Sequence, residues 1–168
     1  MTDQPRYRRR AARVLLVDRS DRVLLLRFFR DPTNPALGHG WVTPGGGVHD
    51  GESLPQAGAR ELWEETGLRI DPYELGQPVA YAEGHVDRGW ATGLFRDDFF
   101  FHRVDTHRVD TSLMEAFELS GHAGHRWWAV DELTSTADTV YPYGLAALVT
   151  DLLAGRLPQR PVRLPWQP

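Results

Sequence analysis

The chain has 168 residues, a formal net charge of −4 and no cysteine. A chain of this length can bury a sizeable core as one domain, the lack of cysteine excludes disulfides and thiol catalysis, and the acidic balance argues against general affinity for nucleic acid. No apolar run approaches the roughly 20 residues that a membrane-spanning helix needs. We therefore expect one domain over residues 1–168, located in the cytoplasm, with neither DNA nor a membrane as its partner.

The first part of the chain predicts two paired strands followed by a loop. Residues 1–7 are expected to be a loose N-terminus. Residues 11–18 are rich in valine and leucine and predict a strand, and residues 22–29 predict its partner after a short turn. Residues 31–40 hold two prolines and two glycines, which predicts a loop. Its position just before Trp41 would place this loop near the site that the next residues form.

A helix is predicted over residues 56–66, which contain no proline and many good helix formers. Ser53 and Gln56 have the spacing of a capping box, and Gly67 stands where a left-handed C-terminal cap would lie. Four residues at helical spacing predict the buried stripe of this helix: Ala59, Leu62, Trp63 and Thr66.

The second half predicts more strands. Residues 77–86 and 94–104 read as strands with residues 87–93 as the turn between them. Residues 105–124 are polar and predict an irregular segment. Residues 125–130 predict a further strand.

Two more helices are predicted near the C-terminus. Asp131 can cap a short helix, and Pro142 suits the start of a final helix at residues 143–154 that ends at Gly155. The tail at 156–168 has four prolines and is expected to be extended. Strands, one acidic helix, more strands and a final helix predict an α/β fold in which helices cover both faces of a sheet.

Three carboxylates crowd one side of the predicted helix at residues 56–66. Residues three and four apart are neighbours on a helix surface, so Glu61 faces both Glu64 and Glu65, and like charges there oppose helix formation. A divalent cation would relieve the repulsion, and Mg²⁺ prefers carboxylate oxygens. The alternative is a solvated acidic face, and the three glutamates by themselves leave both interpretations open.

Two neighbouring features favour the cation. Gly45, Gly46 and Gly47 form a loop whose backbone can approach a phosphate or offer a carbonyl to a metal. Arg60 can pair with Glu52 across the junction of loop and helix and hold both in place.

These residues carry a resemblance to a known family. The spacing Gly46-x5-Glu52-x7-Arg60-Glu61-Leu62-x-Glu64-Glu65-x-Gly67-Leu68 resembles the Nudix box of the Nudix hydrolases without a departure. The preceding Trp41-x-x-Pro44-Gly45-Gly46 is similar to the family's lead-in. The resemblance implies a Nudix-type α/β/α sandwich with a mixed sheet between helices. It also implies metal-dependent hydrolysis of a diphosphate linkage in a nucleoside diphosphate joined to another group.

The resemblance also implies site residues and a cofactor. The expected metal is Mg²⁺, with Mn²⁺ as a substitute, and its expected ligands are Gly45 through its carbonyl, Glu61, Glu64 and Glu65. Glu61 is expected to serve as ligand, base or both, while Glu52 and Arg60 orient the site. Several branches use another acid from a later loop, for which Glu115 and Glu118 are the candidates; we prefer Glu115, and the alternative is that both are ordinary surface acids.

The residues that hold the rest of the substrate are less defined by the pattern. The candidates are Arg27, Arg30, Trp41, Gly46 and Gly47, and the competing interpretation of each side chain is a surface or core role. Trp90, Phe95 and Arg96 lie at a predicted hairpin that could reach a substrate or a second subunit. This hairpin and Trp166 in the tail make a homodimer a reasonable expectation.

The substrate stays open at this point. A proline that marks many ADP-ribose hydrolases of the family is absent where Ala82 to Gly84 stand, so nucleotide sugars, ADP-ribose and nucleoside triphosphates all remain candidates. Two other functions compete: a nucleotide-sensing module without turnover, and a pyrophosphohydrolase acting on RNA 5′ ends.

Overall fold

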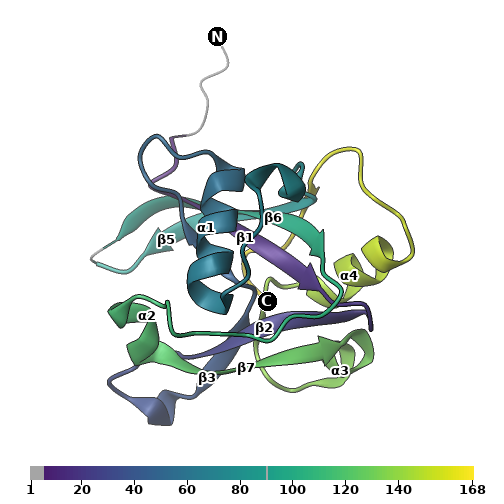
Figure 1. Cartoon of the computed structure of the whole chain (residues 1–168). Helices are drawn as coiled ribbons and strands as arrows, with labels where there is room; N and C mark the ends of the chain where they lie inside the picture. Colours follow the sequence, from purple (N-terminus) through teal and green to yellow (C-terminus); the bar gives the residue numbers. More distant parts are fainter. Residues whose placement is uncertain (1–5, 90) are drawn as a thin grey trace.

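A computed structural model describes residues 6–89 and 91–168. Its helices are α1 (Leu54–Thr66), α2 (Ala116–Gly121), α3 (Val130–Ser135) and α4 (Leu145–Leu153). Its strands are β1 (Arg9–Val17), β2 (Arg22–Phe29), β3 (His39–Val42), β4 (Gly45–Gly47), β5 (Ala80–Asp87), β6 (Thr92–Arg103), β7 (His122–Ala129), β8 (Val140–Tyr141) and β9 (Val162–Arg163). Two short 3-10 helices cover Pro35–Leu37 and Pro72–Leu75. The expected α/β fold with a mixed sheet and helices on both faces is therefore confirmed (Figure 1).

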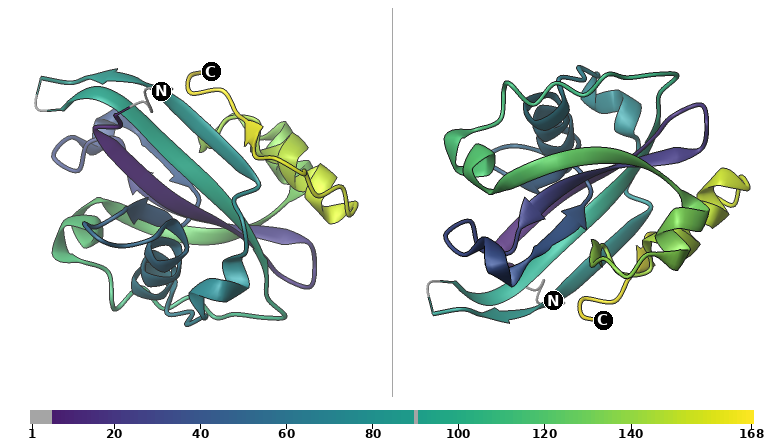
Figure 2. Two further views of the ribbon diagram at one scale, coloured as in Figure 1. Left: turned by 90° about the horizontal axis from the view of Figure 1, so that it is seen from above. Right: turned by 90° about the horizontal axis from the view of Figure 1, so that it is seen from below.

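The sheet has the strand order β8-β3-β2-β1-β6-β5-β9, and it divides between β1 and β2. Along one side β1 pairs in parallel with β6 over its whole length, from Arg9 to Val17. Along its other side β1 pairs first with β4 and then with β2, where the register records the single pair Val17↔Val23. The two halves of the sheet therefore diverge from that joint, as Figure 2 shows, and the segment from β3 to β4 crosses the gap between them.

Each face of β1 contributes to a separate core, because alternate residues of a strand point to opposite faces. On one face Leu16 packs with Leu62 of α1. On the other face Leu15 and Val17 pack with Leu148 of α4. Burial of each such side chain stabilises the fold by about 1.5–3 kcal/mol. The helices α1 and α4 consequently lie on opposite sides of the sheet (Figure 2).

The predicted N-terminal and C-terminal caps of α1 are confirmed. Ser53 and Gln56 form the capping box, and Gly67 ends the helix in the left-handed region with φ 75°. The predicted buried stripe is wrong at Trp63, which is only partly buried and lies 4.9 Å from the Arg69 guanidinium. Glu61 and Glu65 are buried instead, because the helix rests on the sheet with its acidic edge turned inward.

Three other expectations differ from the structure. The segment 105–124 contains α2 and the first residues of β7, which its polar composition did not indicate. The helix α3 begins after Ala129 rather than after an Asp131 cap. The tail at 156–168 is extended but also joins the sheet as β9, parallel to β5, and buries Leu164 in the core.

Residues 1–5 and Trp90 lie outside the described residues, whereas Tyr7 is held by a 2.8 Å hydrogen bond from its hydroxyl to Glu83. Within the described ranges, no helix combines the length and the apolar character that crossing a membrane would require.

Candidate metal and phosphate site

The buried acids of α1 face the glycine-rich strand β4. The Gly45 N–H donates a 2.7 Å hydrogen bond to Glu65 Oε2. A Cβ placed on Gly46 would lie 2.5 Å from Glu61 Oε1, so no residue larger than glycine fits without moving that carboxylate. The close approach of the loop backbone to the helix therefore explains the glycine at position 46, whereas a Cβ on Gly45 would meet Arg13 Cα of β1 at 2.5 Å.

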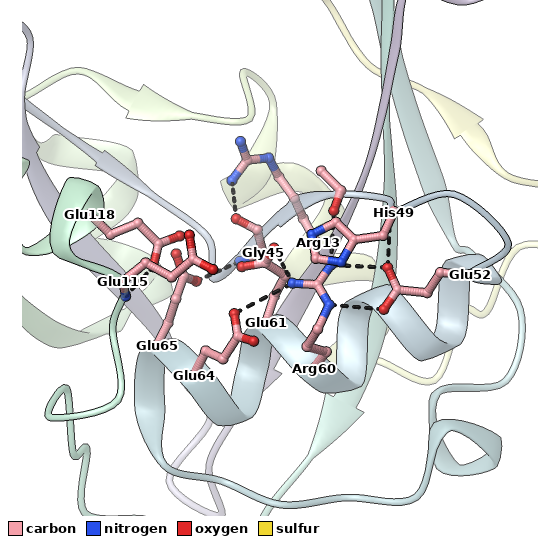
Figure 3. Close-up of polar contacts among 11 residues, drawn as sticks. Arg13, Gly45, His49, Glu52, Arg60, Glu61, Glu64, Glu65, Glu115 and Glu118 are labelled. Atoms are coloured by element: carbon pink, nitrogen blue, oxygen red, sulfur yellow. Dashed lines mark hydrogen bonds and ion pairs between the residues drawn. The ribbon is translucent and has the colours of Figure 1, made fainter.

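A third carboxylate comes from a distant part of the chain. Glu61, Glu65 and Glu118 each place one oxygen within 4.8 Å of the other two, and Figure 3 shows these side chains turned toward one another. Glu118 lies on α2, which the sequence did not predict. The structure brings Glu118 into this group of three rather than the preferred Glu115, whose backbone N–H donates to Glu118 Oε2 at 3.2 Å. We call these three residues the carboxylate cluster.

Glu64 lies beside the carboxylate cluster on the solvent side. Its side chain is 20% exposed, and its Oε2 is 3.4 Å from Arg60 Nη1. One helical turn separates it from the cluster member Glu61. Glu64 is thus close to the cluster without being among the three acids whose oxygens converge.

Arg60 connects the cluster to the loop. Its guanidinium donates to Glu52 Oε1 at 2.8 Å, to Glu61 Oε1 at 2.7 Å and to the Gly47 carbonyl at 2.9 Å. The hydrogen bonds from Arg60 lower the pKa of Glu52, while Glu52 in turn raises the pKa of Arg60. The predicted pair of Arg60 and Glu52 therefore exists, and it keeps the guanidinium next to the cluster (Figure 3).

The cluster is short of positive charge. Burial raises the pKa of Glu61 even though Arg60 opposes the rise. Burial also raises the pKa of Glu65 well above its ordinary value, against the hydrogen bond from Gly45, and burial raises the pKa of Glu118. Glu61 Oε2 is buried without a hydrogen-bond partner among the described residues. Carboxylate oxygens that converge in this way, with one buried and unpartnered, fit a divalent cation.

The sequence reasoning missed two arginines on β1, next to the loop. Arg13 donates from Nη1 to the carbonyls of Thr43 at 3.1 Å and Gly45 at 3.4 Å. Arg9 lies over Gly47, with its Nε 3.6 Å from the position of a Cβ on that residue, and it makes no hydrogen bond or ion pair with the described residues. Neither arginine belongs to a recognisable sequence spacing, so only the pairing of β1 with β4 reveals them.

Three predicted substrate residues are engaged elsewhere. Arg27 Nη2 lies 3.0 Å from His39 Nδ1, and Arg30 Nη2 donates a hydrogen bond to Thr139 Oγ1 at 2.7 Å. Trp41 is 8% exposed and packs in the core against Trp128. None of the three contacts the carboxylate cluster through the described hydrogen bonds.

A large surface hollow also lies away from the carboxylate cluster. It measures about 1140 Å³ and is bordered by Arg30, Asp138 and Tyr143, among others, but by no member of the carboxylate cluster. Convergent charged groups indicate a reactive site better than volume does, so the carboxylate cluster is the candidate site.

Comparisons with known proteins show what the chain is similar to. A family model described as "NUDIX domain" matches residues 7–148. The chain is 44% identical over 62 residues to the m7GpppN-mRNA hydrolase NUDT17 of Danio rerio, which is 37% of this chain and 20% of that protein. It is 38% identical over 62 residues to an RNA pyrophosphohydrolase of Shewanella piezotolerans, which is 37% of this chain and 32% of that protein.

A solved structure extends the likeness to nearly the whole chain. The MutT protein of Methanosarcina mazei Go1 matches with a TM-score of 0.61 and 18% identity, over 92% of this chain and 98% of that one. At this identity the likeness concerns the fold. The chain itself spans only about a fifth to a third of the curated relatives named above.

Proposed function

Because the chain belongs to the Nudix family, we propose that it hydrolyses a diphosphate linkage in a nucleoside diphosphate joined to another group, and that it uses Mg²⁺. The observation that carries this proposal is the carboxylate cluster, buried against a glycine-rich loop. Nudix hydrolases generally use divalent metals, and Mn²⁺ should substitute because it favours the same oxygen ligands.

The proposed cation ligands come from α1, α2 and the glycine-rich loop. Glu61, Glu65 and Glu118 would hold the cation, with Glu64 and the Gly45 carbonyl as further ligands at its edge. The cation would supply charge neutralisation at the diphosphate oxygens and acidification of water there.

Two arginines and one acid complete the proposed site. Arg9, whose guanidinium lies over Gly47, would bind a substrate phosphate. Arg60, fixed by Glu52, would hold the Gly47 backbone and Glu61 in place. Glu61 Oε2, the buried oxygen without a partner among the described residues, is the atom that we assign to accepting a proton from the attacking water.

A substrate panel tests the proposal. Nucleotide sugars, ADP-ribose and nucleoside triphosphates would be incubated with Mg²⁺ or Mn²⁺, and the products separated by chromatography. Glu65→Gln should reduce turnover by at least about 100-fold, because it removes a charged group from a preorganised site. The matched control is Asp50→Asn, an exposed acid of the following loop, which should keep wild-type turnover. Equal turnover by wild type and Glu65→Gln would refute the assignment.

A second candidate is a pyrophosphohydrolase that acts on RNA 5′ ends. Both relatives named above, an mRNA hydrolase and an RNA pyrophosphohydrolase, have names that point to RNA, although each matches this chain over only 62 residues. Triphosphorylated and capped RNA oligomers therefore belong in the same panel, assayed at low and high salt. Binding of a nucleotide without any turnover by the wild type would favour a sensing module instead.

A further inference from the structure

A buried polar network supports the glycine-rich loop from the side of the sheet opposite α1. Arg13 Nε donates to Asp97 Oδ2 at 2.8 Å, and the two side chains are 14% and 4% exposed. The Tyr141 hydroxyl donates to the same oxygen at 3.0 Å. Arg13 and Asp97 share their face with Leu15 and Phe99, which belong to the core that packs on α4.

This network joins the two halves of the divided sheet. Arg13 lies on β1 and Asp97 on β6, in one half, whereas Tyr141 lies on β8, which pairs with β3 in the other half. The segment that crosses the gap contains Thr43, and its carbonyl accepts a hydrogen bond from Arg13. The network therefore spans the gap at the place where the loop crosses it.

Gly45 lies directly between the network and the carboxylate cluster. Its carbonyl accepts a hydrogen bond from Arg13 Nη1 at 3.4 Å, and its N–H donates to Glu65 Oε2 at 2.7 Å. Gly45 is also pressed against β1, since a Cβ there would lie 2.3 Å from the Ala12 carbonyl oxygen. Any shift of Arg13 should therefore displace Gly45 and, with it, the hydrogen bond that orients Glu65.

We propose that Arg13, Asp97 and Tyr141 are positioning residues, which fix the backbone of Gly45 and so hold Glu65 and the Gly45 carbonyl in the arrangement that binds a cation. Among the described residues, none of the three side chains forms a hydrogen bond or an ion pair with the carboxylate cluster. The inference rests on the proposed function for its consequence in catalysis. The order of the Gly45 backbone and the affinity for a cation can both be measured without turnover.

The test uses Arg13→Lys, which keeps the charge but loses the planar fork that bonds Asp97 and two carbonyls together. Two quantities are measured: the hydrogen-exchange rate of the Gly45 amide by NMR, and the Mn²⁺ concentration that half-saturates the protein by electron paramagnetic resonance. We expect the exchange rate of the Gly45 amide to rise about tenfold and half-saturation to need several-fold more Mn²⁺. Losing hydrogen bonds from a charged group changes equilibrium constants by factors of about this size. Tyr141→Phe should produce the same changes more weakly.

The matched control is Arg10→Lys. Arg10 pairs with the buried Asp98 at 2.6 Å, on the same two strands, but within the described part of the chain its side chain bonds no loop carbonyl. Both quantities should stay within about twofold of wild type in this variant. The Leu24 amide, buried on β2, reports any general loss of stability.

Equal acceleration at Gly45 and Leu24, unchanged Mn²⁺ binding in Arg13→Lys, or the same response in Arg10→Lys would overturn the inference. Tyr141→Phe decides the matter if Arg13→Lys does not fold. The outcome is separable from that of the substrate panel: a protein that hydrolyses nothing can still show the Gly45 response, and an active enzyme can lack it.

Discussion

At the scale of single residues, the site depends on carboxylates that are buried before any cation is bound. Glu61 and Glu65 are 5% and 4% exposed, and burial disfavours the charged form of each. Such groups are costly to the fold unless something positive joins them. Arg60 offsets part of this cost at Glu61 through a 2.7 Å ion pair. Under the proposed function, a bound cation would supply the remaining positive charge.

Glu118 and Glu115 form a natural pair for testing the cluster, because they lie three residues apart at the same small helix. Glu118→Gln should raise the Mn²⁺ concentration for half-saturation by about tenfold, since it removes one ionised oxygen ligand. The amide oxygen can still accept from the Glu115 N–H, so α2 should stay in place. Glu115→Gln should bind Mn²⁺ like the wild type. The reverse ranking, measured by calorimetry, would restore Glu115 as the ligand.

At the scale of elements, two local structures set the frame of the site. The helix α1 is defined by its own caps, Ser53 at the start and Gly67 at the end. The turn after β1 is defined by Asp18, whose carboxylate accepts from the backbone N–H of Ser20 at 2.9 Å and from Arg22 through both backbone and side chain. This turn adjoins the single β1–β2 residue pair, Val17↔Val23, that joins the two halves of the sheet.

The C-terminal cap of α1 can be tested with two glycines of similar conformation. Gly67 has φ 75° and Gly51 has φ 78°, but only at Gly67 would a Cβ meet a neighbour, Asp110 Cβ at 3.0 Å. Gly51→Ala should cost about 1 kcal/mol of unfolding free energy from backbone strain, and Gly67→Ala about 2–3 kcal/mol because crowding adds to the strain. Urea unfolding measures the free energy of unfolding of both variants. Equal losses would show that Asp110 moves aside at no cost, which would contradict the prediction.

The Asp18 turn predicts a pH dependence of stability. Burial opposes ionisation of Asp18, but the hydrogen bonds from Arg22 and Ser20 outweigh it, so its pKa lies below the ordinary value. A lowered folded-state pKa contributes stability that is present above the unfolded pKa of about 3.9 and is lost as pH falls through the folded value. Asp18→Asn should therefore be less stable than wild type by about 1 kcal/mol at pH 7, with the gap closing below about pH 4. A gap that is unchanged at pH 3, measured by urea unfolding, would contradict this.

At the scale of the whole molecule, segments far apart in the chain complete the fold around the divided sheet. The tail pairs β9 with β5, and Trp166 packs against Tyr141 with ring centroids 6.3 Å apart. Gly84 on β5 lies directly under this indole, because a Cβ there would be 2.1 Å from Trp166 Cδ1. The tail therefore covers the face of the sheet that carries Tyr141.

Gly84→Ala tests this coverage. The added methyl should displace Trp166 and cost about 1–3 kcal/mol of unfolding free energy, as overpacking usually does. Trp166→Ala should remove the conflict, so the double variant should be no less stable than Trp166→Ala alone. Chemical unfolding of the wild type and the three variants gives a double-mutant cycle. If the two single losses of unfolding free energy simply add in the double variant, the two residues do not interact.

Several features of this protein could be predicted from neighbouring residues alone. The capping box of α1, its Gly67 end and the fixed spacing from Gly46 to Leu68 are set by interactions within a few residues of one another. The pair of Arg60 and Glu52 spans eight positions across one loop and one helical turn, and it too was predictable. The strands β1 and β2 followed from their apolar runs, within one or two residues of their ends.

Other features were decided only by the tertiary structure. Glu118 joins Glu61 and Glu65 because β7 pairs with β2 and carries α2 to the open side of α1, and no property of residues 105–124 encodes that pairing locally. Arg13 reaches Gly45 because β4 lies beside β1 in one register. The sequence by itself determined the acidic helix and its family, since those depend on short-range spacing. The third carboxylate and the support behind the loop depend on contacts between residues dozens of positions apart, which exist only once the sheet has formed.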